Sequence, residues 1–454
     1  MGCCNEFTRS HAAASAGAGL PAIEPGMPTP AGTGLTRRSM LLGSAGLALT
    51  VYGAADRYGL AAFEDGIAEA ASGPPGSVIV TIFMEGGIDG LSVLAPVNDA
   101  GYIAKRSTLR LDGAGTLPVT GSTDLRWHPK AAGLKALHDA GKATLFPAIS
   151  YEHPNQSHFT SRHFYEVGAL DETGSTGWLG RWLDIVGSVN NPIQGLTLGG
   201  QLSPMLASVT NPVAAAYSPS GYDFPSPGVY STSVTTAMAN GFTQLGGAAT
   251  SDPTLAQARK AQANSALLNT QFATPLGTPP AYYPANNDLA GSLRDLALML
   301  SATPTPLPIR ACALRANGGF DTHSAQATTF GDQLESNCLA IQAFQQHLES
   351  AGIADRVITL LWSEFGRRPE ENDSGGTDHG AAGVGFLIGT KANGQIVGAP
   401  PSLAPAGLDA DGNVRATSDF RELYCSLLEG WMNTDAAQVI PGAAGLGRYA
   451  ILDP

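Results

Sequence analysis

Carboxylates and imidazoles recur in this 454-residue sequence just after segments with the pattern of β-strands. Six of these side chains are candidate metal ligands: Asp89, Asp321, His323, Glu364, Asp378 and His379. Oxygen and imidazole donors together suit Zn²⁺ or Mn²⁺ best, and Ca²⁺ or Mg²⁺ is the alternative. We therefore predict one or two divalent ions, which would clamp an anionic ester and activate a nucleophile.

Ser157 and His158 open a predicted helix and are the candidate catalytic residues. A serine at a helix N-terminus can act as a nucleophile or contact an anion, and a metal-activated water is the alternative nucleophile. Arg162 and Arg367 are candidates for binding the phosphate or sulfate oxygens of a substrate.

Each of these residues also has a purely structural explanation. Ser157 could cap its helix, and Asp321 with His323 could form an Asx-turn before the next helix. Glu364 could simply pair with Arg367 or Arg368. The metal hypothesis rests on four predicted strand ends that carry ligand-type side chains together.

Strands and helices alternate along the rest of the chain. Apolar runs rich in β-branched residues predict strands over 77–84, 143–149, 309–316, 356–362 and 384–388. Helical spacing of apolar residues predicts helices over 131–140, 157–168, 177–186, 287–301, 325–351 and 419–432. This order indicates an α/β fold, a doubly wound and mainly parallel sheet with helices on both faces. Such sheets bind ligands at the carboxyl ends of their strands.

The chain divides into a leader over 1–75 and one domain over 76–454. The domain contains a loop-rich insertion over 203–284 with a helical segment at 254–271. In the leader, Arg37-Arg38 precedes a short apolar run and a small-residue cleavage site at 68–70. This order predicts export by the twin-arginine translocase to the periplasm or cell surface. The apolar run is too short for a stable membrane span, so none is expected after cleavage.

Composition excludes several classes of function. The formal net charge of −13 argues against nucleic acid as a partner. The sequence has no G-x-S-x-G, P-loop, H-E-x-x-H or dinucleotide-binding motif in a suitable context. The odd number of cysteines after the leader indicates buried thiols rather than a disulfide framework.

Several motifs, in this order, resemble an exported bacterial family, domain-of-unknown-function family 1501. They are the twin-arginine leader, Phe83–Leu91, Gln156–Phe159, Gly177–Trp182, Gly319–His323, Ser363–Arg367, Gly375–Gly380 and Thr417–Arg421. That family is grouped with the alkaline phosphatase and sulfatase superfamily. The resemblance therefore implies an alkaline phosphatase-like fold with a two-metal site at its strand ends.

The resemblance also implies roles for individual residues. Asp89 resembles the superfamily's first-strand aspartate, and Ser157 stands where its nucleophile precedes a helix. Asp321 and His323 resemble its Asp/His ligand pair, although the spacing is Asp-x-His instead of Asp-x-x-x-His. Glu364 falls where the superfamily has Asp-His, and it is followed by phenylalanine.

The late histidine of the superfamily corresponds to His379, accompanied by Asp378. The sequence lacks the Cys/Ser-x-Pro-x-Arg motif of formylglycine sulfatases. Together these features predict an exported metal-dependent hydrolase of phosphate or sulfate esters, acting on a small anionic ester or a polymer. The alternative is a non-catalytic envelope protein on the same fold that binds a surface partner or polymer.

Overall fold

The computed structural model describes residues 76–113, 115–220, 222, 228–272, 276–303 and 305–453. The predicted leader, with Arg37 and Arg38, lies outside these ranges. Within them, no helix has both the length and the apolar character needed to cross a membrane.

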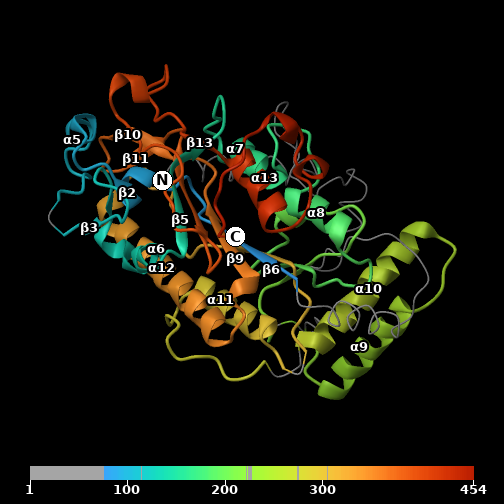
Figure 1. The fold of residues 1–454 in the computed structure, drawn as a ribbon. Helices are drawn as coiled ribbons and strands as arrows, with labels where there is room; N and C mark the ends of the chain where they lie inside the picture. The colour runs from blue at the N-terminus through green and yellow to red at the C-terminus, as the bar shows by residue number, and fades with distance from the viewer. Residues whose placement is uncertain are drawn as a thin grey trace, which may run out of the picture.

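An eight-stranded sheet forms the centre of the described part of the chain, in the order β13-β5-β12-β9-β1-β8-β6-β7 (Figure 1). Its strands are β1 (Val78–Phe83), β5 (Ala143–Ser150), β6 (Gly195–Leu198), β7 (Ala214–Ala216), β8 (Ala311–Arg315), β9 (Val357–Trp362), β12 (Gly383–Ile388) and β13 (Ser418–Asp419). Neighbouring strands pair in parallel except around β12, which is antiparallel to both β5 and β9. The predicted mainly parallel sheet is confirmed.

Strand β12 follows β9 through a connection that contains no crossover helix. Residues 363–382, all described, form only the antiparallel pair β10 (Arg367–Glu371) and β11 (Thr377–His379). A parallel neighbour is usually reached through a helix, whereas here the chain returns antiparallel to β9. The residues before β12 therefore lie at the same sheet edge as those that follow β9.

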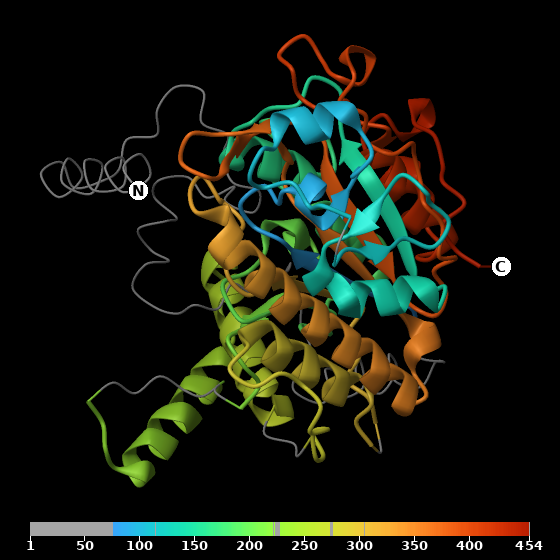
Figure 2. The same ribbon diagram turned by 90° about the vertical axis from the view of Figure 1, so that its left-hand side faces the viewer.

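Helices cover both faces of the sheet, because alternate residues of its strands point to opposite sides (Figures 1 and 2). Val78, Val80 and Ile82 share one apolar core with helices α6 (Ala132–Asp139), α11 (Asp288–Leu300) and α12 (Gln326–Ser350). Ile79 and Phe83 face the other core, which includes α7 (His158–Val167), α8 (Trp178–Val186) and α13 (Phe420–Gly430). The doubly wound α/β fold is therefore confirmed.

Smaller elements decorate this frame. A three-stranded sheet contains β2 (Leu94–Ala95), β3 (Leu117–Pro118) and β4 (Arg126–Trp127), near the short helices α4 (Gly90–Val93) and α5 (Ala100–Lys105). Single 3₁₀ turns occur at Pro129–Ala131, Pro204–Leu206, Ala354–Arg356, Pro405–Gly407, Ala436–Gln438 and Ala443–Gly445.

The predicted insertion over 203–284 has two structurally different parts. Its first part contains β7, which pairs with β6 at the edge of the main sheet. Its second part contains helices α9 (Thr232–Gly246) and α10 (Pro253–Phe272), which contact each other and extend away from the sheet (Figures 1 and 2). All residues of α9 are described, and none of its side chains is buried.

Candidate metal centre

Three imidazoles meet at one carboxylate oxygen. Oδ1 of Asp321 lies 3.0 Å from Nε2 of His323 and 3.3 Å from Nε2 of His379. Nε2 of His158 lies 3.6 Å from the same oxygen. Asp321 and His323 follow β8, His379 ends β11 and His158 begins α7, so distant parts of the chain form this cluster.

The other ring nitrogen of each histidine faces an oxygen atom. Nδ1 of His158 lies 2.8 Å from Oε1 of Glu364, and Nδ1 of His379 lies 2.9 Å from the backbone oxygen of Gln156. Nδ1 of His323 lies 3.2 Å from Oδ1 of Asp378. In a neutral imidazole these oxygens place the proton on Nδ1, which leaves the Nε2 lone pair directed at the cluster.

These atoms fit a divalent metal ion. The Nε2 atom of His158 is buried and has no hydrogen-bond partner among the residues that the structure describes. One ligand atom each from His158, Asp321 and His379 lie within 4.8 Å of one another, and Nε2 of His323 is 3.0 Å from that of His379. Tetrahedral Zn²⁺ with bonds of about 2.0–2.1 Å separates its ligand atoms by about 3.3 Å. His158, Asp321 and His379 could therefore hold such an ion, and His323 lies beside them.

The charge states of the cluster favour cation binding. Burial acts to raise the pKa of Asp321, but the nearby imidazoles of His158 and His379 and the Arg367 guanidinium hold that pKa far below its usual range. Burial acts to lower the pKa of His158, but the carboxylates of Asp321 and Glu364 raise it to about 9. Without a metal ion, His158 therefore carries a proton at neutral pH and lies as a cation between these two carboxylates.

Glu364 orients His158 and is itself held by the loop that follows β1. Its buried carboxylate accepts hydrogen bonds from the amides of Gly86 at 2.9 Å and Gly87 at 3.1 Å. Both glycines have positive φ values, 109° and 65°, and a Cβ on Gly87 would lie 2.2 Å from the Phe365 ring. The loop can present its two amides to Glu364 because both positions are glycine.

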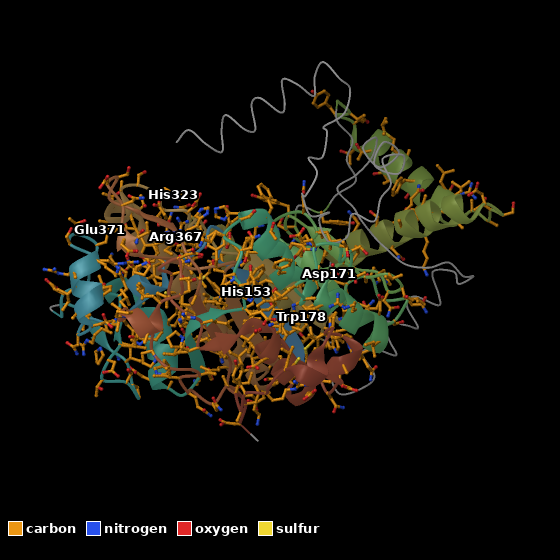
Figure 3. The ribbon with its side chains drawn as sticks, turned by 90° about the horizontal axis from the view of Figure 1, so that it is seen from above. His153, Asp171, Trp178, His323, Arg367 and Glu371 are labelled. Atoms are coloured by element: carbon orange, nitrogen blue, oxygen red, sulfur yellow. The ribbon has the colours of Figure 1, made fainter. Side chains whose placement is uncertain are left out.

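Arg367, a predicted anion contact that is labelled with His323 in Figure 3, has a buried side chain whose guanidinium forms hydrogen bonds to several parts of the protein. It donates hydrogen bonds to the backbone oxygens of Gly86, of Gly87 at 2.7 Å and of Thr377 at 2.8 Å. It also donates to Oδ1 of Asp321 at 2.6 Å. These bonds hold the loop after β1, strand β11 and the cluster carboxylate together.

Arg162, the second predicted anion contact, is half-buried on α7. Its Nε atom lies 2.8 Å from Oε1 of Glu166. It stands one helical turn after His158, which places the two side chains on the same side of the helix. Arg162 therefore projects from the same side of α7 as His158, and it is partly exposed, in contrast to the enclosed Arg367.

Asp89 lies in a separate buried network. Its Oδ1 accepts a hydrogen bond from Arg106 Nη2 at 2.9 Å, and its Oδ2 accepts one from Gln326 Nε2 at 2.6 Å. Oε1 of Gln326 accepts hydrogen bonds from the hydroxyls of Thr322 and Thr377, both at 2.8 Å. Asp89 is therefore connected through Gln326 to the loops that carry the cluster, but the structure does not bring it to the three imidazoles.

Ser157 is the N-cap residue of α7. Its hydroxyl accepts a hydrogen bond from the Thr160 amide at 3.5 Å, and its own amide donates to Oδ1 of Asn155 at 2.8 Å. The capping contact agrees with the structural explanation of this serine. Its role as a nucleophile stays a prediction, as do the metal roles of the six candidate ligands.

Sequence reasoning did not find every residue that supports the cluster. It gave His158 a catalytic role and no ligand role, and it did not single out Arg106, Gln326 or Asn372. The Asn372 amide donates to Asp378 Oδ1 at 3.0 Å, and its oxygen accepts from the amide of Gly376 at 3.0 Å. Asn372 precedes the glycine pair Gly375-Gly376, two residues before Asp378, and this turn signal could have indicated the contact.

Comparison with protein families supports the resemblance seen in the motifs. Residues 309–443 match the family model described as "Protein of unknown function (DUF1501)". This segment contains Asp321, His323, Glu364 and His379, whereas His158 lies before it. A search of curated proteins gives no match.

Solved structures similar to this chain include members of the alkaline phosphatase and sulfatase group. A protein in the alkaline phosphatase superfamily from Vibrio parahaemolyticus shares 9% identity, with 88% of this chain and 72% of that chain covered and a TM-score of 0.36. The zinc complex of the C-terminal periplasmic domain of EcEptC from Escherichia coli shares 9% identity over 84% and 93%, with a TM-score of 0.36. A 2-O GAG sulfatase shares 10% identity over 83% and 72%, with a TM-score of 0.31.

We expect Asp89→Asn to destabilise the protein without removing metal ligands. Loss of one partner leaves Arg106 as an uncompensated buried charge, which costs about 3–5 kcal/mol of the free energy of unfolding. Asp332→Asn is the matched control, because that carboxylate is 80% exposed and its ion pair contributes about 0–1 kcal/mol. Urea denaturation of metal-free protein measures the first effect, and elemental analysis measures metal content. Normal stability with lost metal would instead make Asp89 a ligand.

We expect the metal-free protein to lose stability as the pH rises from about 6.5 to about 9. The folded-state pKa of His158, about 9, lies above the ordinary histidine value of 6.5, so its stabilising contribution is complete below pH 6.5 and lost through pH 9. Thermal unfolding in a chelator should show this decline. His158→Gln cannot titrate and should remove this part of the slope, and an equal slope in that variant would contradict the assignment.

Proposed function

We propose that this protein is an exported metal-dependent hydrolase of phosphate or sulfate esters. The observation that carries the proposal is the convergence of three imidazole Nε2 atoms on one oxygen of Asp321. The motif resemblance to the alkaline phosphatase and sulfatase superfamily supports the same class of reaction.

The residues that would hold the ion are His158, Asp321, His323 and His379. Their nitrogen-rich donor set favours Zn²⁺ or Mn²⁺ over Ca²⁺ or Mg²⁺, which prefer oxygen ligands. A divalent ion supplies Lewis-acid polarisation of the ester and lowers the pKa of a bound water. Glu364, Asp378 and the Gln156 carbonyl orient the three rings from behind.

Two further side chains complete the proposed reaction centre. Arg162 follows His158 by one helical turn and would neutralise an anionic ester oxygen. The Ser157 hydroxyl makes its capping contact at 3.5 Å, a long and weak hydrogen bond that leaves the hydroxyl able to attack an ester. A metal-activated water is the alternative nucleophile.

A non-catalytic role in binding an envelope partner is the second candidate. The observation that favours it is helix α9, whose side chains are all at least partly exposed and include apolar Val234, Met238 and Leu245. Larger exposed apolar patches often mark interaction sites. This role becomes the preferred one if no ester is hydrolysed.

We expect the purified protein to bind Zn²⁺ or Mn²⁺ and to hydrolyse 4-nitrophenyl phosphate or 4-nitrophenyl sulfate. His379→Gln and Asp321→Asn should each lower metal content and hydrolysis by about 100-fold or more, because each removes a ligand. Glu364→Gln should weaken metal affinity by about 10- to 100-fold through the misoriented His158 ring. Elemental analysis and a chromogenic ester assay measure these effects.

The matched control is His153→Asn, which removes an exposed imidazole at a positive-φ position that asparagine tolerates. It should leave metal content and hydrolysis unchanged. The proposal fails if metal-supplemented protein binds no ion, or if Asp321→Asn retains full metal content and activity.

We further propose that the leader directs export by the twin-arginine pathway. Replacing both Arg37 and Arg38 with lysine keeps the charge but removes the recognised pair, so folded protein should accumulate in the cytoplasm. Cell fractionation measures this, and Arg9→Lys in the same leader is the matched control. Unchanged export of the double variant would disprove the route.

A further inference from the structure

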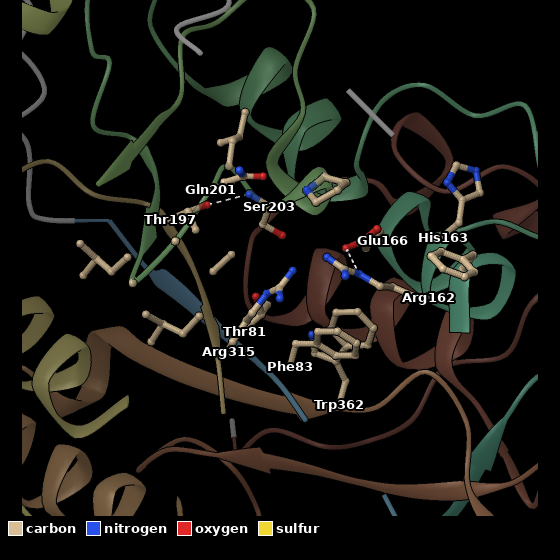
Figure 4. A pocket seen from close by; sticks show the side chains of 18 residues that line it. Thr81, Phe83, Arg162, His163, Glu166, Thr197, Gln201, Ser203, Arg315 and Trp362 are labelled. Atoms are coloured by element: carbon tan, nitrogen blue, oxygen red, sulfur yellow. Dashed lines mark hydrogen bonds and ion pairs between the residues drawn. The ribbon is translucent and has the colours of Figure 1, made fainter. Parts of the chain in front are cut away.

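A cavity of about 320 Å³ is lined in part by residues from the ends of several strands of the main sheet (Figure 4). Among its lining residues are Phe83 at the end of β1, Arg315 at the end of β8 and Trp362 at the end of β9. Trp362 stands two residues before Glu364, and Arg162, which also lines the cavity, stands four residues after His158. The cavity and the centre therefore share the same strand ends and the same helix.

The charged groups at this cavity pair with one another. Arg162 pairs with Glu166 at 2.8 Å and lies 3.7 Å from Oε1 of Glu85. Arg315 pairs with the other oxygen of Glu85 at 3.0 Å. Figure 4 shows the guanidinium groups of Arg162 and Arg315 reaching toward the hollow from two sides. Arg162, Arg315 and Glu166 line the cavity, and Glu85, which is not a lining residue, pairs with both arginines, so the cavity offers both hydrogen-bond donors and acceptors.

Aromatic rings line one wall of the cavity. The Phe83 and Trp362 rings are stacked with centroids 4.2 Å apart, and the Arg162 guanidinium lies 5.0 Å from the Phe83 centroid. Nε1 of Trp362 is buried without a hydrogen-bond partner in the described part of the chain, and this residue is only 5% exposed. An unpaired buried polar atom is costly, so a ligand oxygen here would gain a bond that the protein does not supply.

We propose that this cavity binds the uncharged, polyhydroxylated part of the substrate, a sugar or polyol ring. Hydroxyl groups both donate and accept, which matches the alternating guanidinium and carboxylate groups. The C–H face of such a ring packs against the aromatic wall. A purely aliphatic ligand would bury these charged groups without partners. The inference rests on the proposed function in one respect, that the ester group of the same substrate lies at the metal centre.

The test measures direct binding of neutral probes by calorimetry and saturation-transfer NMR. Methyl α-D-glucopyranoside and myo-inositol should bind to wild-type protein both with and without added Zn²⁺. Cyclohexanol, which has one hydroxyl and a similar ring, should bind at least about tenfold more weakly. Sodium sulfate should not displace the polyols from metal-free protein.

Two variants locate the binding. Arg315→Gln changes a side chain that is 58% exposed, so the fold should persist, and polyol binding should weaken about five- to tenfold. Trp362→Phe removes the unpaired N–H and should weaken binding by a similar factor. Arg294→Gln is the matched control, because this arginine on α11 is 38% exposed and its ion pair among the described residues is with its neighbour Asp295. It should leave binding unchanged.

The outcomes separate this inference from the metal hypothesis. His379→Gln should lose metal and keep polyol binding, so an inactive or metal-free protein still tests the cavity. The inference is overturned if neither polyol binds, if cyclohexanol binds as tightly as the polyols, or if sulfate competes with them. It is also overturned if Arg315→Gln and Trp362→Phe both bind as wild type does.

Discussion

The carboxylate of Asp321 is the point on which the arrangement of the strand ends depends. Its Oδ1 faces the Arg367 guanidinium and three imidazoles that come from α7, from β11 and from the loop after β8. Nitrogen groups brought this close repel one another when they carry protons, and only an anion between them removes that cost. The same contacts lower the pKa of Asp321, because the surrounding donors stabilise its charged form.

Around this point, the protein uses buried polar groups to connect segments that share no secondary structure. Arg367 donates hydrogen bonds to backbone oxygens of β11 and of the loop after β1, and Glu364 accepts hydrogen bonds from amides of that same loop. Such a network stabilises the fold when every group has a partner, and it becomes costly when one partner is lost. Both positions must be glycine because neighbours crowd this turn. A Cβ on Gly86 would lie 2.4 Å from the backbone nitrogen of Asp321, and a Cβ on Gly87 would lie 2.2 Å from the Phe365 ring.

The long elements could be predicted from sequence because their apolar spacing extends over several turns, as in α12, or over a fully buried strand, as in β1. The short strands β6, β7 and β13 have too few residues for a pattern, and only pairing with the sheet defines them. Because ligands bind at the carboxyl ends of strands in such sheets, the sequence predicted Asp321, His323 and His379 in one candidate site. The structure places these three together. The sequence could not separate Asp89 from them, because its partner Gln326 lies 237 residues away in the sequence.

The charge balance gives an independent reason for a divalent ion at this centre. With neutral imidazoles, the carboxylates of Asp321, Glu364 and Asp378 contribute −3 and Arg367 contributes +1, which leaves −2. A proton on His158 removes half of this excess, whereas one divalent cation removes all of it. The Asp89–Arg106 pair is neutral by itself and adds nothing to this sum. The proposed +2 ion would therefore balance the groups around the three rings, and the distant pair needs no such compensation.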